Sequence, residues 1–242
     1  MIEGWVKNGD IRIHYLDNTG PSKETTPLVI IPGIAETGEE YEDLIQALLP
    51  RRALVVTMRG RGLSDAPKSG FTLEHHVSDI EVVVNRITID KFAIFGYGRG
   101  VAYALGYAVA HTDRINGLII GDYPAMQKDL PEGWSDFFLK STNKRVLESM
   151  TLETLKAIEK DSKNVDFLKH LKEIDCPVLI LQGSEESVGL TEDGAKDYLR
   201  AMPDARVRII DPDKPGSTNP KSAEFADTLK KFFQETKNCG IN

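Results

Sequence analysis

Cysteine is scarce in this chain of 242 residues, which contains only Cys176 and Cys239. Cys176 stands where an apolar run begins, and we expect it to be a buried thiol. Cys239 lies in a polar tail. Two cysteines so placed cannot form a disulfide framework, so the sequence excludes a small disulfide-stapled scaffold and favours a reducing, cytoplasmic location.

Long apolar stretches and a surplus of positive charge are also missing. No run approaches the about 20 apolar residues of a membrane-spanning helix. The first residues show no basic segment followed by an apolar one, so we expect no signal peptide. The formal net charge is −7, which argues against nucleic acid or an anionic membrane as a partner.

Short apolar runs rich in Val and Ile are present instead. Six of them read LVIIPG, ALVVTM, FAIFGY, GLIIGDYP, PVLILQG and VRIIDPD. Such near-continuous runs are typical of strands buried on both faces. An earlier run, residues 11–17, alternates between apolar and polar residues, which predicts a half-exposed antiparallel strand.

Helical patterns separate these runs, at residues 39–49, 72–87, 99–111, 191–202 and 222–234. Alternating strands and helices predict an α/β fold with a mostly parallel central sheet and helices on both faces. In such folds ligands bind at the carboxyl ends of the strands. One domain with a small insertion accounts for the length.

Residues 126–174 show no strand pattern, only polar and helical sequence. We expect a helical lid here, inserted between core segments 1–125 and 175–242. The lid would cover the carboxyl edge of the sheet, because it leaves the chain directly after an expected strand. The alternative is a pair of solvent-exposed helices.

The stretch AIFGYGRGVAYALGYA, residues 93–108, predicts a buried strand, a sharp turn and a helix. This is the setting in which a hydrolase presents its nucleophile. The tip of the turn is Gly98, which carries no oxygen or sulfur lone pair. Gly96 and Gly100 flank it, as expected where strand and helix backbones approach closely.

A dinucleotide cofactor is the alternative for these glycines. That function needs G-x-x-G spacing within a G-x-G-x-x-G turn after the first strand of the sheet. Here the glycines are spaced G-x-G-x-G and follow a later strand. We therefore expect no cofactor. We also expect no metal, since the adjacent His75 and His76 diverge by about 100° on a helix.

Several motifs, in order along nearly the whole chain, resemble the α/β-hydrolase superfamily and its lid-bearing esterases and lactonases. IPGIAET is similar to the loop that follows the third strand and holds the oxyanion donors. MRGRGLSDAP resembles the turn after the fourth strand, GYGRG the nucleophile elbow, and VLILQGSEES the strand and loop that carry the catalytic acid. The resemblance implies the α/β-hydrolase fold.

The resemblance also implies a Ser-His-acid triad, from which this chain departs. The nucleophile position is Gly98, and no histidine follows His170. The position implied for the base falls on Pro215, with Gly216 and Ser217 as alternatives. The position implied for the acid is Glu186. We interpret these as vestigial catalytic positions of a degenerate triad.

The backbone donors of the oxyanion hole are expected to survive. They are the amides of Ile34, which follows Gly33, and of Arg99, which begins the helix after the elbow. The Arg99 guanidinium either serves a ligand or is a solvated cation at the helix start. Tyr97 and Tyr123 complete the expected ligand-binding residues.

The five histidines have structural explanations. His14 lies on the alternating strand, His111 near a helix end and His170 in the expected lid. His75 and His76 begin a helix that we expect on the far side of the sheet from the site.

Three hypotheses for the function remain. The first is a non-catalytic pocket protein that binds a small carbonyl- or carboxylate-bearing ligand, or a protein partner or second copy. The second is an enzyme that works without a covalent step through Glu186, Asp122 or Tyr123. The third is an inactivated carboxylic-ester or lactone hydrolase whose parent carries Ser and His.

Overall fold

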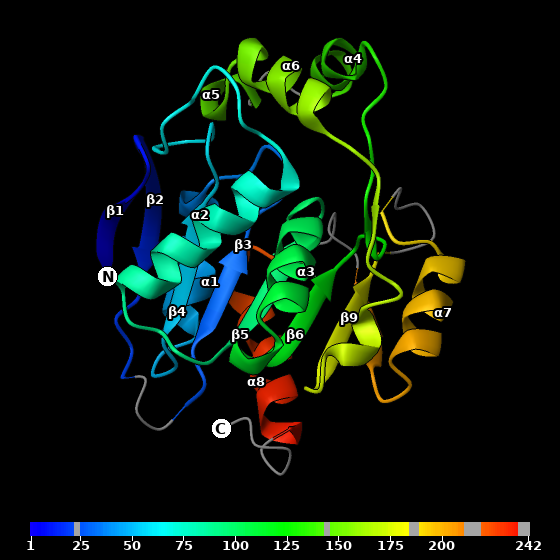
Figure 1. Ribbon diagram of the computed structural model, residues 1–242. Helices are drawn as coiled ribbons and strands as arrows, with labels where there is room; N and C mark the ends of the chain where they lie inside the picture. Colours follow the sequence, from blue (N-terminus) through cyan, green and yellow to red (C-terminus); the bar gives the residue numbers. More distant parts are fainter. Residues whose placement is uncertain (22–24, 143–145, 184–188, 211–218, 237–242) are drawn as a thin grey trace.

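An eight-stranded sheet forms the centre of the computed structural model, which describes residues 1–21, 25–142, 146–183, 189–210 and 219–236 (Figure 1). The strands, in spatial order, are β1 (Ile2–Asn8), β2 (Ile11–Asp17), β4 (Ala53–Thr57), β3 (Leu28–Ile31), β5 (Phe92–Tyr97), β6 (Ile115–Gly121), β9 (Val178–Gln182) and β10 (Arg206–Ile209). β2 pairs antiparallel with β1 and β4, and the other pairs are parallel. The predicted α/β-hydrolase fold is confirmed.

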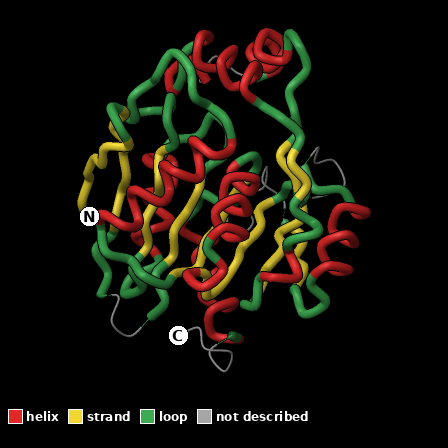
Figure 2. The backbone as a smooth tube through the Cα atoms, viewed as in Figure 1, coloured by secondary structure: helices red, strands yellow, loops and turns green. Residues whose placement is uncertain are grey.

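Helices cover both faces of this sheet (Figures 1 and 2). The main ones are α1 (Glu42–Ala47), α2 (Leu73–Arg86), α3 (Gly100–Ala110), α7 (Glu192–Ala201) and α8 (Ala226–Glu235), with 3-10 turns at Gly38–Tyr41, Thr112–Arg114, Leu171–Glu173 and Ala223–Phe225. Residues of α2, α3 and α7 share one buried apolar cluster with the sheet, and those of α1 and α8 share a second. The five predicted helical segments are confirmed, with a 3-10 turn at the start of the first and of the last.

Two expectations about strand burial need correction. β10 is an edge strand with no fully buried residue, and Ile209 is 65% exposed, because only β9 flanks it. β2 has the predicted antiparallel pairing, but His14 on it is fully buried rather than half-exposed. Strand β1 lies beside β2, and the Trp5 ring packs on the imidazole.

Residues 126–166 form a cap above the carboxyl ends of the strands (Figure 1). Its helices are α4 (Trp134–Ser141), α5 (Val146–Ser149) and α6 (Leu152–Asp161). At its base, β7 (Met126–Gln127) pairs antiparallel with β8 (Val165–Asp166). The expectation that this segment contains no strand was wrong, because two-residue strands are too short to produce a periodic pattern.

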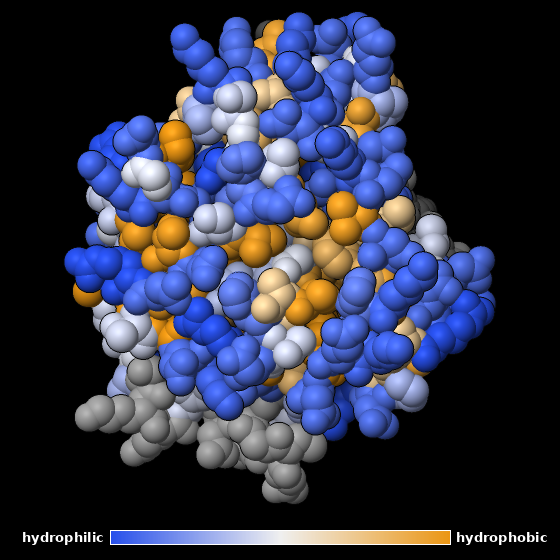
Figure 3. All heavy atoms as spheres, viewed as in Figure 1, coloured by the Kyte–Doolittle hydropathy of each residue, from blue (hydrophilic) through white to orange (hydrophobic). Residues whose placement is uncertain are grey.

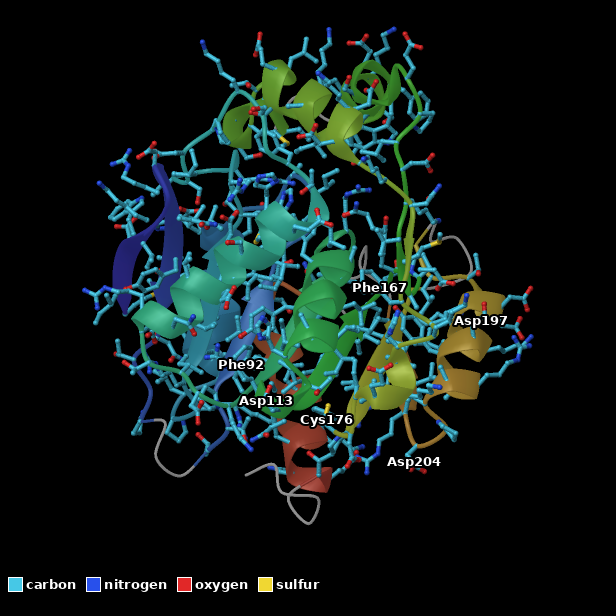
Figure 4. The ribbon with its side chains drawn as sticks, viewed as in Figure 1. Phe92, Asp113, Phe167, Cys176, Asp197 and Asp204 are labelled. Atoms are coloured by element: carbon cyan, nitrogen blue, oxygen red, sulfur yellow. The ribbon has the colours of Figure 1, made fainter. Side chains whose placement is uncertain are left out.

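The cap has an apolar cluster of its own, made of Phe71 from the core and Met150, Leu155 and Ile158 from the cap. After β8 the chain returns to the core, where Phe167 is buried just below the cap (Figure 4). The outward surface of the cap is mostly hydrophilic in the view of Figure 3, and apolar side chains gather over α2 and α3 below it.

Cys176 lies at the amino end of β9, on the side of the molecule away from the cap (Figure 4). It is half-buried, and burial raises the pKa of its thiol to about 12. It lines a cavity of about 560 Å³. Cys239 lies outside the described residues. Within the described ranges, no helix has the length and apolar character needed to cross a membrane.

Candidate functional site

The turn between β5 and α3 has the geometry of a nucleophile elbow. Gly98 at its tip adopts a φ of +50°, and its amide donates a 2.8 Å hydrogen bond to the carbonyl of Gly121 on β6. Among the described residues, a Cβ built on Gly98 would meet only the Cα of Gly33 within 4 Å, at 3.9 Å. The described residues therefore leave open space at the tip.

The glycines beside the tip have no such room. A Cβ on Gly96 would lie 2.6 Å from the Cα of Val101, and one on Gly100 would overlap the carbonyl oxygens of Ile31 and Pro32. The close approach of strand and helix expected from the sequence is present.

The loop after β3 brings Gly33 and Ile34 next to the elbow. The amide of Glu36 donates to the Gly33 carbonyl at 3.2 Å, which closes a tight turn. Within the described part of the chain, neither the Ile34 amide nor the Arg99 amide donates to a protein acceptor. Two backbone donors are thus unoccupied at this end of the sheet.

A carboxylate that the sequence analysis missed supports this loop. Glu36 accepts hydrogen bonds from the Gly33 amide at 2.7 Å and from the Tyr41 hydroxyl at 2.6 Å. Lys221 lies 3.1 Å from Glu36 and 2.8 Å from Glu40. Burial and the neighbouring Glu36 raise the pKa of Tyr41 well above its ordinary value. No spacing rule connects these residues, because Lys221 arrives from the other end of the chain.

Arg99 links the elbow to the cap. Its guanidinium donates to the carbonyl of Lys128 at 3.0 Å and to the hydroxyl of Ser162 at 2.7 Å. Only 5% of the residue is exposed, and its Nε–H is buried without an acceptor. The interpretation of Arg99 as a solvated helix-start cation was wrong, because the cap covers it.

A second buried arginine, Arg61, lies beside the same loop. Its Nε donates to the carbonyl of Ile34 at 2.9 Å, and its Nη1 lies 2.9 Å from Nε2 of His76. The Tyr103 hydroxyl is 3.5 Å from its Nη2. Burial lowers the pKa of Arg61, and the positive charge of Arg99 also lowers it.

The expectation that His76 lies on the far side of the sheet was wrong. Helix α2 packs in the same layer as α3, and the His76 ring stacks on Tyr103 with centroids 4.0 Å apart. The other ring nitrogen of His76 is 2.8 Å from the Thr72 carbonyl. Burial, then the charge of Arg61, lowers the pKa of His76 well below its ordinary value. With both nitrogens engaged, this ring is not placed to act as the missing base.

His75, His170 and His111 each make local contacts. His75 contacts the Thr72 hydroxyl, and His170 is exposed beside Glu173. His111 ends α3, as predicted, and packs on Tyr107.

His14 approaches two carboxylates, and these three residues are the described group with atoms close enough to hold a metal ion. Glu3 lies 3.1 Å from Nε2 of His14, whereas Glu39 lies 3.8 Å from Nδ1. Nδ1 also contacts the Thr57 hydroxyl at 3.0 Å. Because the two carboxylates face different ring nitrogens, they do not converge on one nitrogen of His14.

Asp122 and Tyr123 follow β6. Asp122 adopts a φ of +53°, and its Oδ1 accepts the amides of Gly183 at 2.8 Å and Leu190 at 2.9 Å. These amides bracket the segment that carries Glu186. The pKa of Tyr123 is raised, because the effect of burial exceeds the opposing effect of the nearby Arg99 charge.

Several predicted positions remain without a structural test. Tyr97 is half-buried at the end of β5. Glu186, Pro215, Gly216 and Ser217 lie outside the described residues.

Comparisons with known proteins agree with this architecture. The family described as alpha/beta hydrolase fold matches residues 26–141. The bromoperoxidase from Bacillus anthracis superimposes with a TM-score of 0.78 at 19% identity, over 96% of this chain and 100% of that one. A putative aryl esterase from Burkholderia cenocepacia gives 0.76 at 18% identity, over 98% and 100%. This chain has the α/β-hydrolase fold.

Relatives within the superfamily differ in how much of this chain they match. Haloalkane dehalogenase 2 of Mycobacterium tuberculosis is 30% identical over 121 residues, which are 49% of this chain and 41% of the dehalogenase. The chain thus spans well under half of that relative's length. A putative non-heme chloroperoxidase of Synechocystis is 23% identical over 93% of this chain and 96% of its own. The chain therefore has hydrolase relatives, while the chemistry of its own site rests on the residues described above.

Proposed function

We propose that this α/β-hydrolase-fold protein is a non-catalytic pseudo-hydrolase that binds a small carbonyl- or carboxylate-bearing molecule, or acts as a regulatory protein. The observation that carries this proposal is the glycine at the elbow tip. Gly98 holds the strained turn geometry of a nucleophile without the atoms that attack a carbonyl. The unoccupied amides of Ile34 and Arg99 support a binding role.

The absence of a histidine base supports a non-catalytic role independently of Gly98. A hydroxyl nucleophile needs a proton acceptor beside it, and no histidine follows His170 in the sequence. When triad residues are removed from a working hydrolase, about 10³–10⁴-fold acceleration over water remains from the oxyanion donors and binding. We therefore expect turnover of this size at most.

An inactivated or divergent carboxylic-ester or lactone hydrolase is the second candidate. The open space above Gly98 favours it, because a serine side chain would fit there without rearrangement of the neighbouring backbone. An enzyme that uses Asp122 without a covalent step has less support, since that carboxylate already accepts two backbone amides.

The test installs the missing groups. Gly98→Ser and Pro215→His are made singly and together, and a chromogenic short-chain ester is assayed. Gly9→Ser is the matched control, since Gly9 has a φ of +62° and an open Cβ position on the β1–β2 turn. We expect no turnover by the unmodified protein above the residual level that oxyanion donors and binding supply. Activity only in the double variant supports a decayed hydrolase, whereas substantial turnover by the unmodified protein contradicts the proposal.

A thermal-shift screen with small acids and lactones tests the binding role, since a ligand that binds only the native state raises the unfolding temperature. We also propose a cytoplasmic location, supported by the scarcity of cysteine. If no small molecule shifts the transition, a protein partner or a second copy of the chain becomes the better proposal.

A further inference from the structure

Two buried guanidinium groups near the elbow have no carboxylate partner among the described residues. Arg99 is 5% exposed and Arg61 is 1% exposed. Their hydrogen bonds end on neutral groups. Arg99 contacts the Lys128 carbonyl and the Ser162 hydroxyl, and Arg61 contacts the carbonyls of Ile34 and Arg59, the His76 ring and the Tyr103 hydroxyl. A buried charge without a counter-ion destabilises the folded protein.

Arg99 also carries a donor that nothing in the described protein satisfies. Its Nε–H is fully buried and has no acceptor. Buried donors are almost always paired, so an unpaired one in a native structure calls for an explanation. A bound anion would supply both the missing acceptor and the missing counter-charge.

The place for such an anion is the open space at the elbow tip. Arg99 directly follows Gly98, where a Cβ would meet nothing closer than 3.9 Å. The amides of Ile34 and Arg99 are unoccupied there, and Arg99 precedes the first turn of α3, an 11-residue helix. Backbone amides at a helix N-terminus favour negative charge.

The protein's own carboxylates nearby are already engaged. Glu36 binds the Gly33 amide and Lys221, and Asp122 binds the two amides that bracket the segment after β9. Neither contacts Arg99 or Arg61 as an ion pair. Among the described residues no carboxylate supplies the missing negative charge, and a bound anion would provide it.

A neighbouring cavity limits what this anion is. A cavity of about 880 Å³ between cap and core includes Ala35, which follows Ile34, and Gly62, which follows Arg61. Its remaining lining includes four carboxylates, those of Glu36, Glu39, Glu40 and Glu148. Lys221 pairs with Glu36 and Glu40, whereas Glu39 and Glu148 retain negative charge that repels a ligand with several negative charges. A ligand with one carboxylate on an otherwise uncharged body would supply the counter-charge for Arg99 and would be repelled less by these acids.

We propose that the elbow site, formed by Gly98, Arg99 and Ile34, takes small monocarboxylates, with the ligand carboxylate paired to the Arg99 guanidinium and within reach of the Ile34 and Arg99 amides. This rests on the proposed non-catalytic binding function and names its ligand class. Arg61 adds positive charge at the same place and holds the Ile34 loop through its carbonyl.

Matched acids and amides test this inference. Benzoate with benzamide, and butyrate with butyramide, are titrated into the unmodified protein by calorimetry in HEPES at constant ionic strength, with succinate as the dicarboxylate. We expect at least one monocarboxylate to bind about tenfold or more tightly than its amide, because charge-assisted hydrogen bonds are the stronger ones. Succinate is expected to bind more weakly than butyrate.

Three variants locate the effect. Arg99→Met should lower the affinity for the acid to that of its amide, whereas Arg99→Lys should keep a preference for the acid. Glu192→Gln, in the exposed ion pair with Lys196 on α7, is the control and should bind acids as the unmodified protein does. Thermal unfolding confirms that each variant is folded before titration.

The outcomes separate this inference from the function on which it rests. Equal affinity for acid and amide, or a preference that persists in Arg99→Met, overturns the monocarboxylate inference and leaves a non-catalytic pocket in place. Binding of neither member of any pair overturns the monocarboxylate inference and leaves the regulatory form of the proposed function. Ester turnover by the unmodified protein overturns the non-catalytic function while a preference for acids still stands.

Discussion

Two turns at the carboxyl edge of the sheet each bury arginine, and they balance its charge differently. After β4, Arg59 forms a bidentate pair with Asp79, with Nε–Oδ2 at 2.7 Å and Nη2–Oδ1 at 2.6 Å. After β5, Arg99 meets only neutral acceptors among the described residues and retains an unpaired Nε–H. The Arg59–Asp79 pair is complete within the protein, whereas Arg99 lacks a counter-charge among the described residues, as does Arg61 on the same turn as Arg59.

This difference separates a structural arginine from one that is available to a ligand. Removing one partner from a buried pair costs several kcal/mol because it leaves an uncompensated charge. Arg59 is stabilised by Asp79 whether or not a ligand is present. The charge of Arg99 has no counter-ion among the described residues until an anion binds. We therefore assign ligand recognition to Arg99 at the elbow and a structural role to the Arg59–Asp79 pair.

Breaking the complete pair should produce the largest effect. Asp79→Asn leaves the Arg59 charge buried and unpaired, and we expect it to lower the free energy of unfolding by about 3–5 kcal/mol. Urea unfolding measures this. The exposed pair Glu192–Lys196 supplies the control, since Glu192→Gln should leave the transition unchanged. A loss no larger than that of the control would remove the structural half of the comparison.

The two glycines of the elbow should differ in their tolerance of a methyl group. Gly100→Ala places a Cβ against the carbonyls of Ile31 and Pro32, and we expect a loss of about 3 kcal/mol from overpacking. Gly98→Ala finds open space and suffers only from its positive φ, about 1 kcal/mol. Urea unfolding of both variants gives the comparison. Equal losses would mean that the space at the tip is not open.

The buried imidazole beside Arg61 should make stability depend on pH. The pKa of His76 lies well below the unfolded value of 6.5, so the unfolded chain binds the additional proton as the pH falls through 6.5. Stability should therefore decline from pH 7 toward pH 5. His14, whose pKa is also lowered by burial, contributes in the same direction.

Glutamine variants separate the two rings. His76→Gln should flatten this decline more than His14→Gln does, because only the pKa of His76 is lowered well below the ordinary value. Thermal unfolding across this pH range measures both slopes. An unchanged slope in His76→Gln would show that its ring is not held neutral.

The smallest effect is expected where the cap meets the elbow. Ser162→Ala removes one acceptor of Arg99 and one donor to the Ile158 carbonyl, and we expect a loss of about 0.5–1.5 kcal/mol. Hydrogen exchange should be faster in α6 than in the unmodified protein and unchanged in α2. Uniform exchange in both helices would mean that this contact does not hold the cap.

Much of the fold was predictable because strands and helices leave periodic patterns. The six strands predicted from apolar runs are present, five of them buried. The elbow with Gly98 at its tip follows from a motif whose spacing reflects the close backbone approach at Gly96 and Gly100. The exposure of β10 was not predicted. Its apolar residues resemble those of a central strand, and the sequence does not show that β10 lies at the edge of the sheet beside β9.

The charges around the site could not be read from spacing. Arg99 was identified as a site residue, but its burial depends on Ser162 in the cap, which is 63 residues away. The contact of Lys221 with Glu36 joins the two ends of the chain. Such contacts depend on the packing of the cap and the termini, for which local sequence contains no signal.

The central claim is that this elbow binds without covalent chemistry. Rapid mixing of the unmodified protein with p-nitrophenyl acetate, followed by intact-mass spectrometry, tests it most directly. We predict no burst of nitrophenolate and no acetyl group on residues 93–108. A stoichiometric burst with an acetyl group on the elbow segment would contradict the account.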